Sequence, residues 1–321
     1  MPVYKSTIQN PIITVCIPCY NQENSIKETV DSVLSQGIEN IQIIISDDAS
    51  KDKTPEIVKE YKDRYPDIIN LILHEKNHGI AGNVESIQPY IRGKYLCWLD
   101  GDDLYLEGKL KKQLDFMEDN PDYLVCFHDV WVNQKDSGIR YRYNDPKIGP
   151  RAYSGYVAKE MITNRCFVSG MTMMVRRDAV SGIKQRPEIT NCADWLYMIE
   201  LSIHGKMKFI DEVLAVYNRH DNNISRLDIN HIYEEKCFDY LQDRYGDKFE
   251  KEIKHGRALL LTMYIFKYIT IGQWKKSWHM LKALCHLVRG DISLLWFITS
   301  KIFKNMAQRI LLLLKTKRIN R

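Results

Sequence analysis

The chain has 321 residues, of which 45% are hydrophobic and 27% are charged, a composition typical of folded globular proteins that argues against intrinsic disorder. The formal net charge of +5 conceals an asymmetry, because residues 251–321 hold 15 Lys and Arg against 2 Asp and Glu, whereas residues 1–250 hold 31 against 39. An acidic body is therefore followed by a basic tail, which suggests that the tail meets an anionic surface.

The cysteines and the N-terminus bear on the compartment in which the protein works. Cys16 and Cys19 have the spacing of a redox motif, but several of the eight cysteines lie in apolar runs and none forms a zinc-ligand pattern. Buried, reduced thiols and a reducing, cytoplasmic compartment are therefore expected. The N-terminus lacks a signal-peptide pattern. No run of about 18 uncharged apolar residues predicts a transmembrane helix.

The first half of the chain alternates apolar strand patterns with helical patterns. Uninterrupted apolar strands separated by helices predict an α/β fold, with a Rossmann-like, mostly parallel sheet covered by helices on both faces. The carboxyl ends of parallel strands then share one edge, where ligands bind. Strands are expected at 12–17, 41–45, 69–73, 95–99 and 123–130, and helices up to about 36 and at 54–64, 82–91 and 107–118.

The second half is less regular. Residues 132–165 are polar and rich in Tyr, Gly and Pro, and they predict a long loop or an irregular hairpin. A strand, a helix and further strand-like residues follow at 167–175, at 194–204 and up to 217. Helical patterns then continue to the end of the chain. We therefore expect one α/β domain at 1–226 and a helical, basic, amphipathic module at 227–321.

Three carboxylates, Asp100, Asp102 and Asp103, directly follow the fourth expected strand. Carboxylates this close repel each other unless a cation joins them. Mg²⁺ and Mn²⁺ suit a site in which a few carboxylates are completed by phosphate oxygens. The pattern predicts a metal-assisted diphosphate site, and the alternative is an acidic turn that caps the next helix.

Two further polar segments end neighbouring strands. Asp47 and Asp48 follow the second strand, where a carboxylate can accept a hydrogen bond from a pyrimidine N–H; an Asx-turn with a helix cap is the alternative. The first strand is expected to break at Pro18, which lacks an N–H. After it, Tyr20 can stack on a base and Asn21 can cap the next helix.

Together these segments resemble family 2 glycosyltransferases of the GT-A fold, an inverting family that includes enzymes of bacterial cell-surface polysaccharide synthesis. The resemblance covers roughly residues 10–225 and rests on the order and spacing of its pieces. The matching pieces lie at 18–21, 47–54, 77–83, 93–95 and 99–103.

The resemblance implies a role for each matched residue. The donor nucleotide would be bound by Pro18, Tyr20, Asn21, Asp48, Asn83, Asp100 and His220. Asp100 and Asp102 match an Asp-x-Asp motif that holds Mn²⁺ or Mg²⁺, with His220 as a further metal ligand or a phosphate contact. Asp194 occupies the place of the catalytic base, although Ala193 stands where the family usually carries Glu.

The implied reaction moves a sugar from a nucleotide-sugar donor, a UDP-sugar by family habit, to a hydroxyl of a glycan or polyprenyl-linked acceptor. Asp194 would remove the hydroxyl proton during attack on the anomeric carbon, and the cation would stabilise the departing diphosphate. Two rivals stay open. A sugar-nucleotide nucleotidyltransferase would need a glycine-rich loop, which residues 18–23 lack, and Ala193 leaves room for an inactive scaffold of a polysaccharide assembly complex.

The C-terminal segments mix apolar and basic residues and include three tryptophans. These segments lie at 258–269, 274–288 and 292–314. The pattern favours a module that rests on a membrane surface, peripheral on the cytoplasmic face of the inner membrane. A helical bundle or a homodimer interface is the alternative. The richness in Leu, Ile and Phe argues against binding of nucleic acid.

Overall fold

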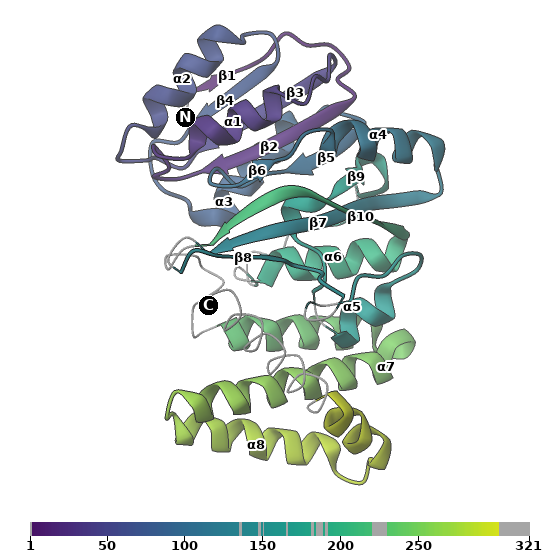
Figure 1. Cartoon of the computed structure of the whole chain (residues 1–321). Coiled ribbons are helices and arrows are strands. Elements are labelled where there is room, and N and C mark those ends of the chain that lie inside the picture. The colour runs from purple at the N-terminus through teal and green to yellow at the C-terminus, as the bar shows by residue number, and fades with distance from the viewer. Residues whose placement is uncertain are drawn as a thin grey trace, which may run out of the picture. The chain divides into compact units, whose positions relative to one another are not determined.

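The computed structural model describes residues 2–134, 137–146, 149, 151–164, 166–180, 183, 189, 192–219 and 230–301. The chain divides into two compact units (Figure 1). The first unit consists of Met1–Tyr143, Ala152–Val157 and Val168–Asn223, and the second consists of Asn144–Arg151, Ala158–Phe167 and Ile224–Arg321. The second unit thus combines the C-terminal part of the chain with two short segments from its middle.

The described residues of the first unit form a ten-stranded sheet with helices packed on it. The strands are β1 (Val3–Tyr4), β2 (Ile13–Cys19), β3 (Ile41–Asp47), β4 (Ile69–Leu73), β5 (Tyr95–Trp98), β6 (Leu104–Tyr105), β7 (Tyr123–Gln134), β8 (Ile139–Arg142), β9 (Met174–Arg176) and β10 (Lys206–Arg219). The α-helices of this unit are α1 (Ile26–Leu34), α2 (Thr54–Arg64), α3 (Gly79–Ile87), α4 (Lys109–Asp119) and α6 (Ala193–His204).

The order and direction of the strands show which edge of the sheet collects the carboxyl ends of the strands. The order is β1-β4-β3-β2-β5-β9-β7-β10-β6, with β8 beside β7. β4, β3, β2 and β5 are parallel neighbours, and β7 pairs in parallel with β10. β9 is antiparallel to both β5 and β7. β7 and β10 therefore run in the same direction as β2 and β5. The carboxyl ends of these strands consequently face one edge, as the predicted α/β fold requires.

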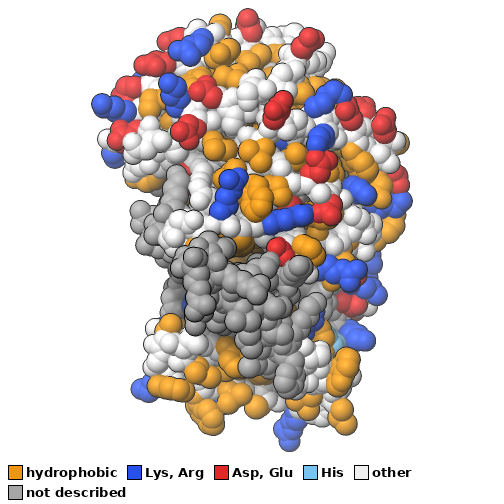
Figure 2. Space-filling model, in the orientation of Figure 1, with side chains coloured by type: hydrophobic (Ala, Val, Ile, Leu, Met, Phe, Trp, Pro, Cys, Tyr) orange, Lys and Arg blue, Asp and Glu red, His pale blue; other side chains and the backbone are white. Residues whose placement is uncertain are grey.

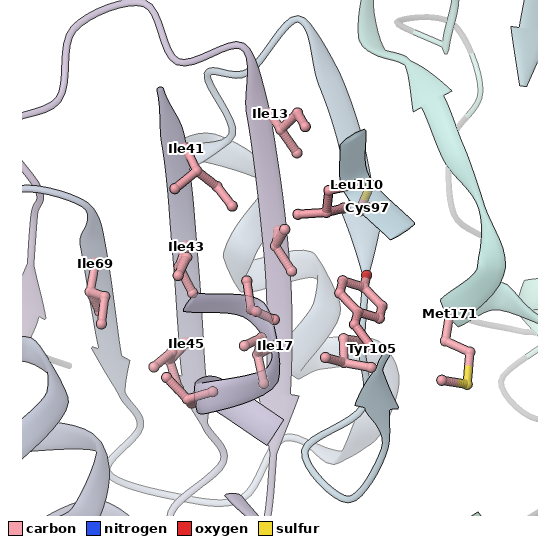
Figure 3. Close-up of a cluster of buried hydrophobic side chains, with 14 of the residues drawn as sticks. Ile13, Ile17, Ile41, Ile43, Ile45, Ile69, Cys97, Tyr105, Leu110 and Met171 are labelled. Carbon is pink, nitrogen blue, oxygen red and sulfur yellow. The ribbon is translucent and has the colours of Figure 1, made fainter. Parts of the chain in front are cut away.

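Apolar side chains on the two faces of the sheet explain why helices cover both. Ile13, Ile17, Ile43 and Ile45 point to one face and pack in the main core (Figure 3) with side chains from α1, α2 and α4. The alternate residues Cys16, Ile44, Ile72 and Leu96 form a separate cluster on the other face, together with Ile87 of α3. Charged side chains of both signs are interspersed over the surface of this unit (Figure 2).

β2 continues through Pro18 to Cys19, so the prediction that the strand breaks at Pro18 was wrong. The carbonyl oxygen of Cys16 faces β5 and accepts the Leu99 N–H at 3.0 Å, whereas the carbonyl of Cys19 faces β3 and accepts the Asp48 N–H at 3.0 Å. Because successive residues alternate, Pro18 faces the β5 side, beyond the last β2–β5 pair. Its missing N–H therefore costs the ladder no hydrogen bond.

A buried polar network crosses the amino-terminal half of the sheet. Thr14 Oγ1 donates to Gln42 Oε1 at 2.7 Å, and Gln42 Nε2 donates to Asn70 Oδ1 at 3.1 Å. Ser6 Oγ donates to the same Asn70 oxygen at 2.6 Å, and the Gly93 N–H donates to Thr14 Oγ1 at 2.8 Å. The network links β2, β3 and β4 with the segment that follows β1 and with the segment that leads into β5.

The second half of the sheet differs from expectation in two places. β7 extends to Gln134, and its end forms a hairpin with β8 within the region predicted to be a loop or irregular hairpin. The strand predicted at 167–175 is shortened to β9, because a 3-10 turn at Gly170–Thr172 precedes it. The Thr172 N–H and Oγ1 both donate to the Ser169 carbonyl, at 2.9 and 2.6 Å, which stabilises that turn.

The described part of the second unit is helical. It contains α5 (Ala158–Asn164), α7 (Asn230–Thr270), α8 (Trp274–Val288) and further helical residues at 292–301. α7 is interrupted at Phe249, where φ is −131° and ψ is 23°. Within the described ranges, every helix is too short or too polar to cross a bilayer.

We predict that Gly93→Ala lowers the free energy of unfolding by about 1–3 kcal/mol, the usual cost of overpacking a core. A Cβ at this position would lie 2.4 Å from the backbone nitrogen of Thr14 and 2.7 Å from the carbonyl carbon of Ile13. Urea denaturation measures the effect. Gly170→Ala is the control, because its Cβ would meet only Met198 Cε at 3.8 Å. Equal stability of the two variants would contradict the prediction.

Candidate active site

The loops that follow β2 and β3 are tied together by hydrogen bonds. The Asn21 N–H donates to Ser50 Oγ and the Lys51 N–H donates to Asn21 Oδ1, both at 2.8 Å. Asn21 has a positive φ of 52°. Its amide oxygen thus holds the neighbouring loop. Tyr20, which is 45% exposed, stands at the end of β2 as a surface for stacking.

Asp48 is buried and held in place from three sides. Its N–H donates to the Cys19 carbonyl at 3.0 Å, and its Oδ1 accepts the His78 N–H at 2.8 Å. Asn77 Nδ2 also donates to the Asp48 carbonyl, at 3.2 Å. The His78 ring lies 4.9 Å from that of His74, centroid to centroid. Residues just after β4 therefore orient the carboxylate that was predicted to contact the base.

Asn83 is buried in α3, and its amide group is bonded within the protein. Its Oδ1 accepts the Ser46 hydroxyl at 2.6 Å, and its Nδ2 donates to the Ser46 carbonyl at 3.1 Å. These bonds attach α3 to β3. A direct contact of Asn83 with the donor stays a prediction, and the observed bonds give this side chain a positioning role.

The loop after β5 is fixed by its inward-facing groups. Asp103 is buried, and its Oδ1 accepts the Asn218 N–H of β10 at 2.8 Å. Asn218 Nδ2 donates to the Asp102 carbonyl at 2.7 Å. From α1, Thr29 Oγ1 donates to the Asp103 carbonyl at 2.9 Å. Asp103 thus anchors the loop, whereas Asp100 keeps some contact with solvent although protein groups crowd around its carboxyl.

The carboxylates of Asp100 and Asp102 lie close to that of Asp194, which is distant from them in sequence. Burial by the surrounding protein, and then the charges of Asp102 and Asp194, raise the pKa of the Asp100 carboxyl to about 7. Asp194 lies in the first turn of α6, where its Oδ1 accepts the Trp195 N–H at 2.8 Å. Burial also raises the pKa of Asp194. The structure therefore brings the predicted metal motif and the predicted base together.

Arg219, the last residue of β10, adds a cation beside Asn218. Its Nε is buried and has no hydrogen-bond partner within the described ranges. Arg219 begins the segment 219–225, which resembles the family segment that closes over the diphosphate, but the resemblance gave a role of its own only to His220. His220 itself lies outside the described residues, so its predicted role as a metal or phosphate ligand stays a prediction.

A family model described as glycosyl transferase family 2 matches residues 14–183, more than half of the chain. The chain belongs to glycosyltransferase family 2. The matched range contains the loops after β2, β3 and β5 with Asp48, Asp100 and Asp102, whereas Asp194 and Arg219 lie beyond it.

Two relatives illustrate how far the sequence similarity reaches. An uncharacterized protein of Mycobacterium tuberculosis is 31% identical over 207 residues, which cover 64% of this chain and 58% of the relative. An uncharacterized glycosyltransferase of Methanocaldococcus jannaschii is 28% identical over 231 residues, which cover 70% of this chain and 78% of the relative. The chain thus spans less than two thirds of the length of the mycobacterial protein.

Two solved structures show the same fold. S. aureus TarS 1–349 in complex with UDP-GlcNAc aligns over 86% of this chain and 81% of TarS, with a TM-score of 0.61 and 15% identity. The mannosyltransferase PcManGT from Pyrobaculum calidifontis, in complex with GDP-Man and Mn²⁺, aligns over 95% of this chain and 88% of its own, with a TM-score of 0.58 and 15% identity. The predicted GT-A fold is confirmed.

Few side chains of the site can serve as ligands of a metal cation. Among the residues that the structure describes, no group of three or more His, Cys, Asp and Glu side chains is arranged to hold a metal ion. Asp100 and Asp102 offer two neighbouring carboxylates. Mg²⁺ is commonly bound by one or two carboxylates together with substrate phosphates and water. The residues present therefore fit a cation that arrives with a diphosphate.

We predict that Asp100→Asn raises the melting temperature of the protein at pH 8, measured with a metal chelator and without donor. The raised pKa of Asp100 means that its ionised form costs folding stability. This cost is complete above about pH 7 and fades as the pH falls toward about 4, the pKa of an unfolded Asp.

The gain from Asp100→Asn should therefore shrink at pH 5. Glu60→Gln, at an exposed position of α2, is the control and should show no such trend. A gain that is independent of pH would show that the ionised form of Asp100, disfavoured by burial and by its neighbours' charges, is not its source.

Proposed function

We propose that this protein transfers a sugar from a nucleoside diphosphate sugar to a hydroxyl group, with inversion at the anomeric carbon. The observation that carries the proposal is the proximity of Asp100, Asp102 and Asp194 at the strand edge that also presents Tyr20 and Asp48. Family membership supports this reaction. With Asp100 and Asp102 assigned to the cation, Asp194 is left as a single base, which is consistent with a single displacement.

The donor is proposed to lie along the ends of β2, β3 and β5. Exposed Tyr20 offers a stacking surface for the base, and Asp48 offers a carboxylate acceptor for a base N–H. A uracil presents such an N–H, and TarS was solved with UDP-GlcNAc. PcManGT was solved with GDP-Man. We propose a UDP-sugar here, with Pro18 and Asn21 shaping the loop beneath the base.

Asp100 and Asp102, with His220, are the residues proposed to hold Mn²⁺ or Mg²⁺. When bound, the cation would supply positive charge to the departing diphosphate. Arg219, whose Nε is buried at the end of β10, is proposed to contact the same phosphates, because a guanidinium can bind phosphate oxygens in pairs. Arg219 would thus add positive charge to the phosphate end of the proposed donor site.

Asp194 is proposed to accept the proton of the acceptor hydroxyl. A hydroxyl is a weak nucleophile at neutral pH, and a base within hydrogen-bond reach strengthens it. The Trp195 N–H holds one Asp194 oxygen at 2.8 Å, which orients the carboxylate. Burial raises the pKa of Asp194 and so increases its proton affinity. Both features favour a base over a purely structural carboxylate.

We predict that Asp194→Asn lowers the rate of transfer about 100- to 10,000-fold, the usual contribution of a general base. Donor affinity should stay near that of the wild type, because the base acts on the acceptor. Transfer is measured by release of nucleoside diphosphate with acceptor present, and affinity by calorimetry. Asp119→Asn, on the exposed end of α4, is the control. Undiminished transfer by Asp194→Asn would remove this residue from the mechanism.

We predict that Asp102→Ala abolishes the metal-dependent part of donor binding. Wild-type affinity for UDP-sugars should rise when Mn²⁺ is added, because the cation neutralises repulsion between the diphosphate and the carboxylates. Calorimetry with and without Mn²⁺ checks both proteins, with Asp115→Ala on α4 as the control. An unchanged Mn²⁺ effect in Asp102→Ala would refute the metal assignment.

The acceptor is proposed to be a glycan or a polyprenyl-linked glycan in cell-surface polysaccharide synthesis, with the protein held at the cytoplasmic face of the inner membrane. A lipid-linked acceptor would be presented at that surface, where the helical second unit is proposed to bind. Two rivals make different products. A nucleotidyltransferase would form nucleoside triphosphate from pyrophosphate, and an inactive scaffold would leave UDP-sugars intact in the presence of Mn²⁺.

A further inference from the structure

Exposed apolar side chains form a continuous stripe on α8. Trp274 is 67% exposed, Trp278 58% and Leu281 37%, and Cys285 is also exposed. Their spacing of four, three and four residues places them on one face of the helix. Ser277 and Val288, the buried residues of α8, lie only along one edge of this stripe, beside Leu281. The stripe therefore remains uncovered after α8 has packed on α7.

The C-terminal end of α7 and the turn that follows carry a second apolar group. Phe266 and Ile269 are 42% and 38% exposed, and Ile271 in the turn is 52% exposed. A surface hollow of about 400 Å³ adjoins the turn and is lined by Gly272, Gln273, Trp274, Lys275 and Lys276. We call this turn and the outer face of α8, residues 266–289, the α8 surface.

The charge of the α8 surface has one sign. Between Glu252 and Asp291 the chain contains no Asp or Glu. Lys275, Lys282 and Arg289 recur at every seventh residue and so flank the apolar stripe along one side. Lys282 Nζ lies 5.8 Å from the Trp278 ring, so its stem lies beside the indole. Figure 2 shows hydrophobic side chains together with Lys and Arg along the margin formed by α8.

We propose that the α8 surface binds the interface of a bilayer that contains anionic phospholipids. Tryptophan and lysine are the side chains that suit this zone, because the indole and the lysine stem are apolar while their ends are polar. A second copy of the chain would bring two surfaces of the same positive charge together, which is unfavourable. The basic segment after residue 301 is not needed for this binding.

The inference makes the proposed membrane contact specific to one surface, and its test does not depend on sugar transfer. Full-length protein is sedimented with vesicles of phosphatidylcholine alone or mixed with phosphatidylglycerol. Trp274→Ser with Trp278→Ser, and separately Lys275→Gln with Lys282→Gln, should each weaken binding to the anionic vesicles at least about tenfold. Wild-type protein should bind neutral vesicles far less well.

Two controls separate the α8 surface from other sources of binding. Tyr156→Ser removes a 75% exposed aromatic ring from the first unit and should leave binding unchanged. Neutralising Lys315, Lys317 and Arg318 in the full chain should retain most of the binding. Melting curves confirm that each variant folds, and donor hydrolysis in solution without vesicles reports separately on the proposed enzymatic function.

Three outcomes overturn the inference. Binding could persist in both double variants of α8, or it could be lost only when Lys315, Lys317 and Arg318 are neutralised. Alternatively, light scattering could show a wild-type dimer that the tryptophan variant dissociates, without binding to anionic vesicles. That last result would assign the α8 surface to a second copy of the chain.

Discussion

Repulsion among the carboxylates of Asp100, Asp102 and Asp194 is the constraint around which the first unit is organised. Left alone, such groups would separate or take up protons, and burial together with this repulsion raises the pKa of Asp100. Asp100 and Asp102 stay in place because hydrogen bonds from Asn218 to Asp103 and to the Asp102 carbonyl fix the backbone of their loop. The proposed cation with its diphosphate would therefore meet a site that is already assembled.

The fixing bonds come from residues other than the three clustered carboxylates. The Asp103 carboxylate accepts the Asn218 N–H, and the Asn83 amide oxygen accepts the Ser46 hydroxyl. The Asn21 side chain connects two loops by accepting the Lys51 N–H. Each of these residues lies in or next to a segment that resembles the family pattern. A motif of this kind therefore mixes residues that touch substrate with residues that hold the loop in shape, and only the hydrogen bonds separate the two groups.

The pattern of apolar runs predicted β2, β3, β4 and β5 well, because buried parallel strands leave a continuous apolar signal. It failed for 167–175, where equally apolar residues fill the core from a turn instead of a strand. The proximity of Asp194 to Asp100 could not follow from periodicity, since 94 positions separate them in the sequence. Only the resemblance to a family implied it. The composition of the C-terminal segments predicted a basic and apolar surface. The apolar stripe on α8 could not be predicted, because it depends on which residues of α8 stay exposed after the helix packs.

The buried network of Thr14, Gln42 and Asn70 has a consequence for strand alignment. In a sheet of Ile and Val, a slip of two residues would return similar apolar side chains to the same face, so the core alone discriminates poorly between alignments. Such a slip would place these amide and hydroxyl groups opposite apolar side chains, without hydrogen-bond partners. Each buried polar group left without a partner costs about 1–3 kcal/mol of stability. Polar groups at one end of the strands thus guarantee that the opposite ends, with their acidic loops, finish level with one another.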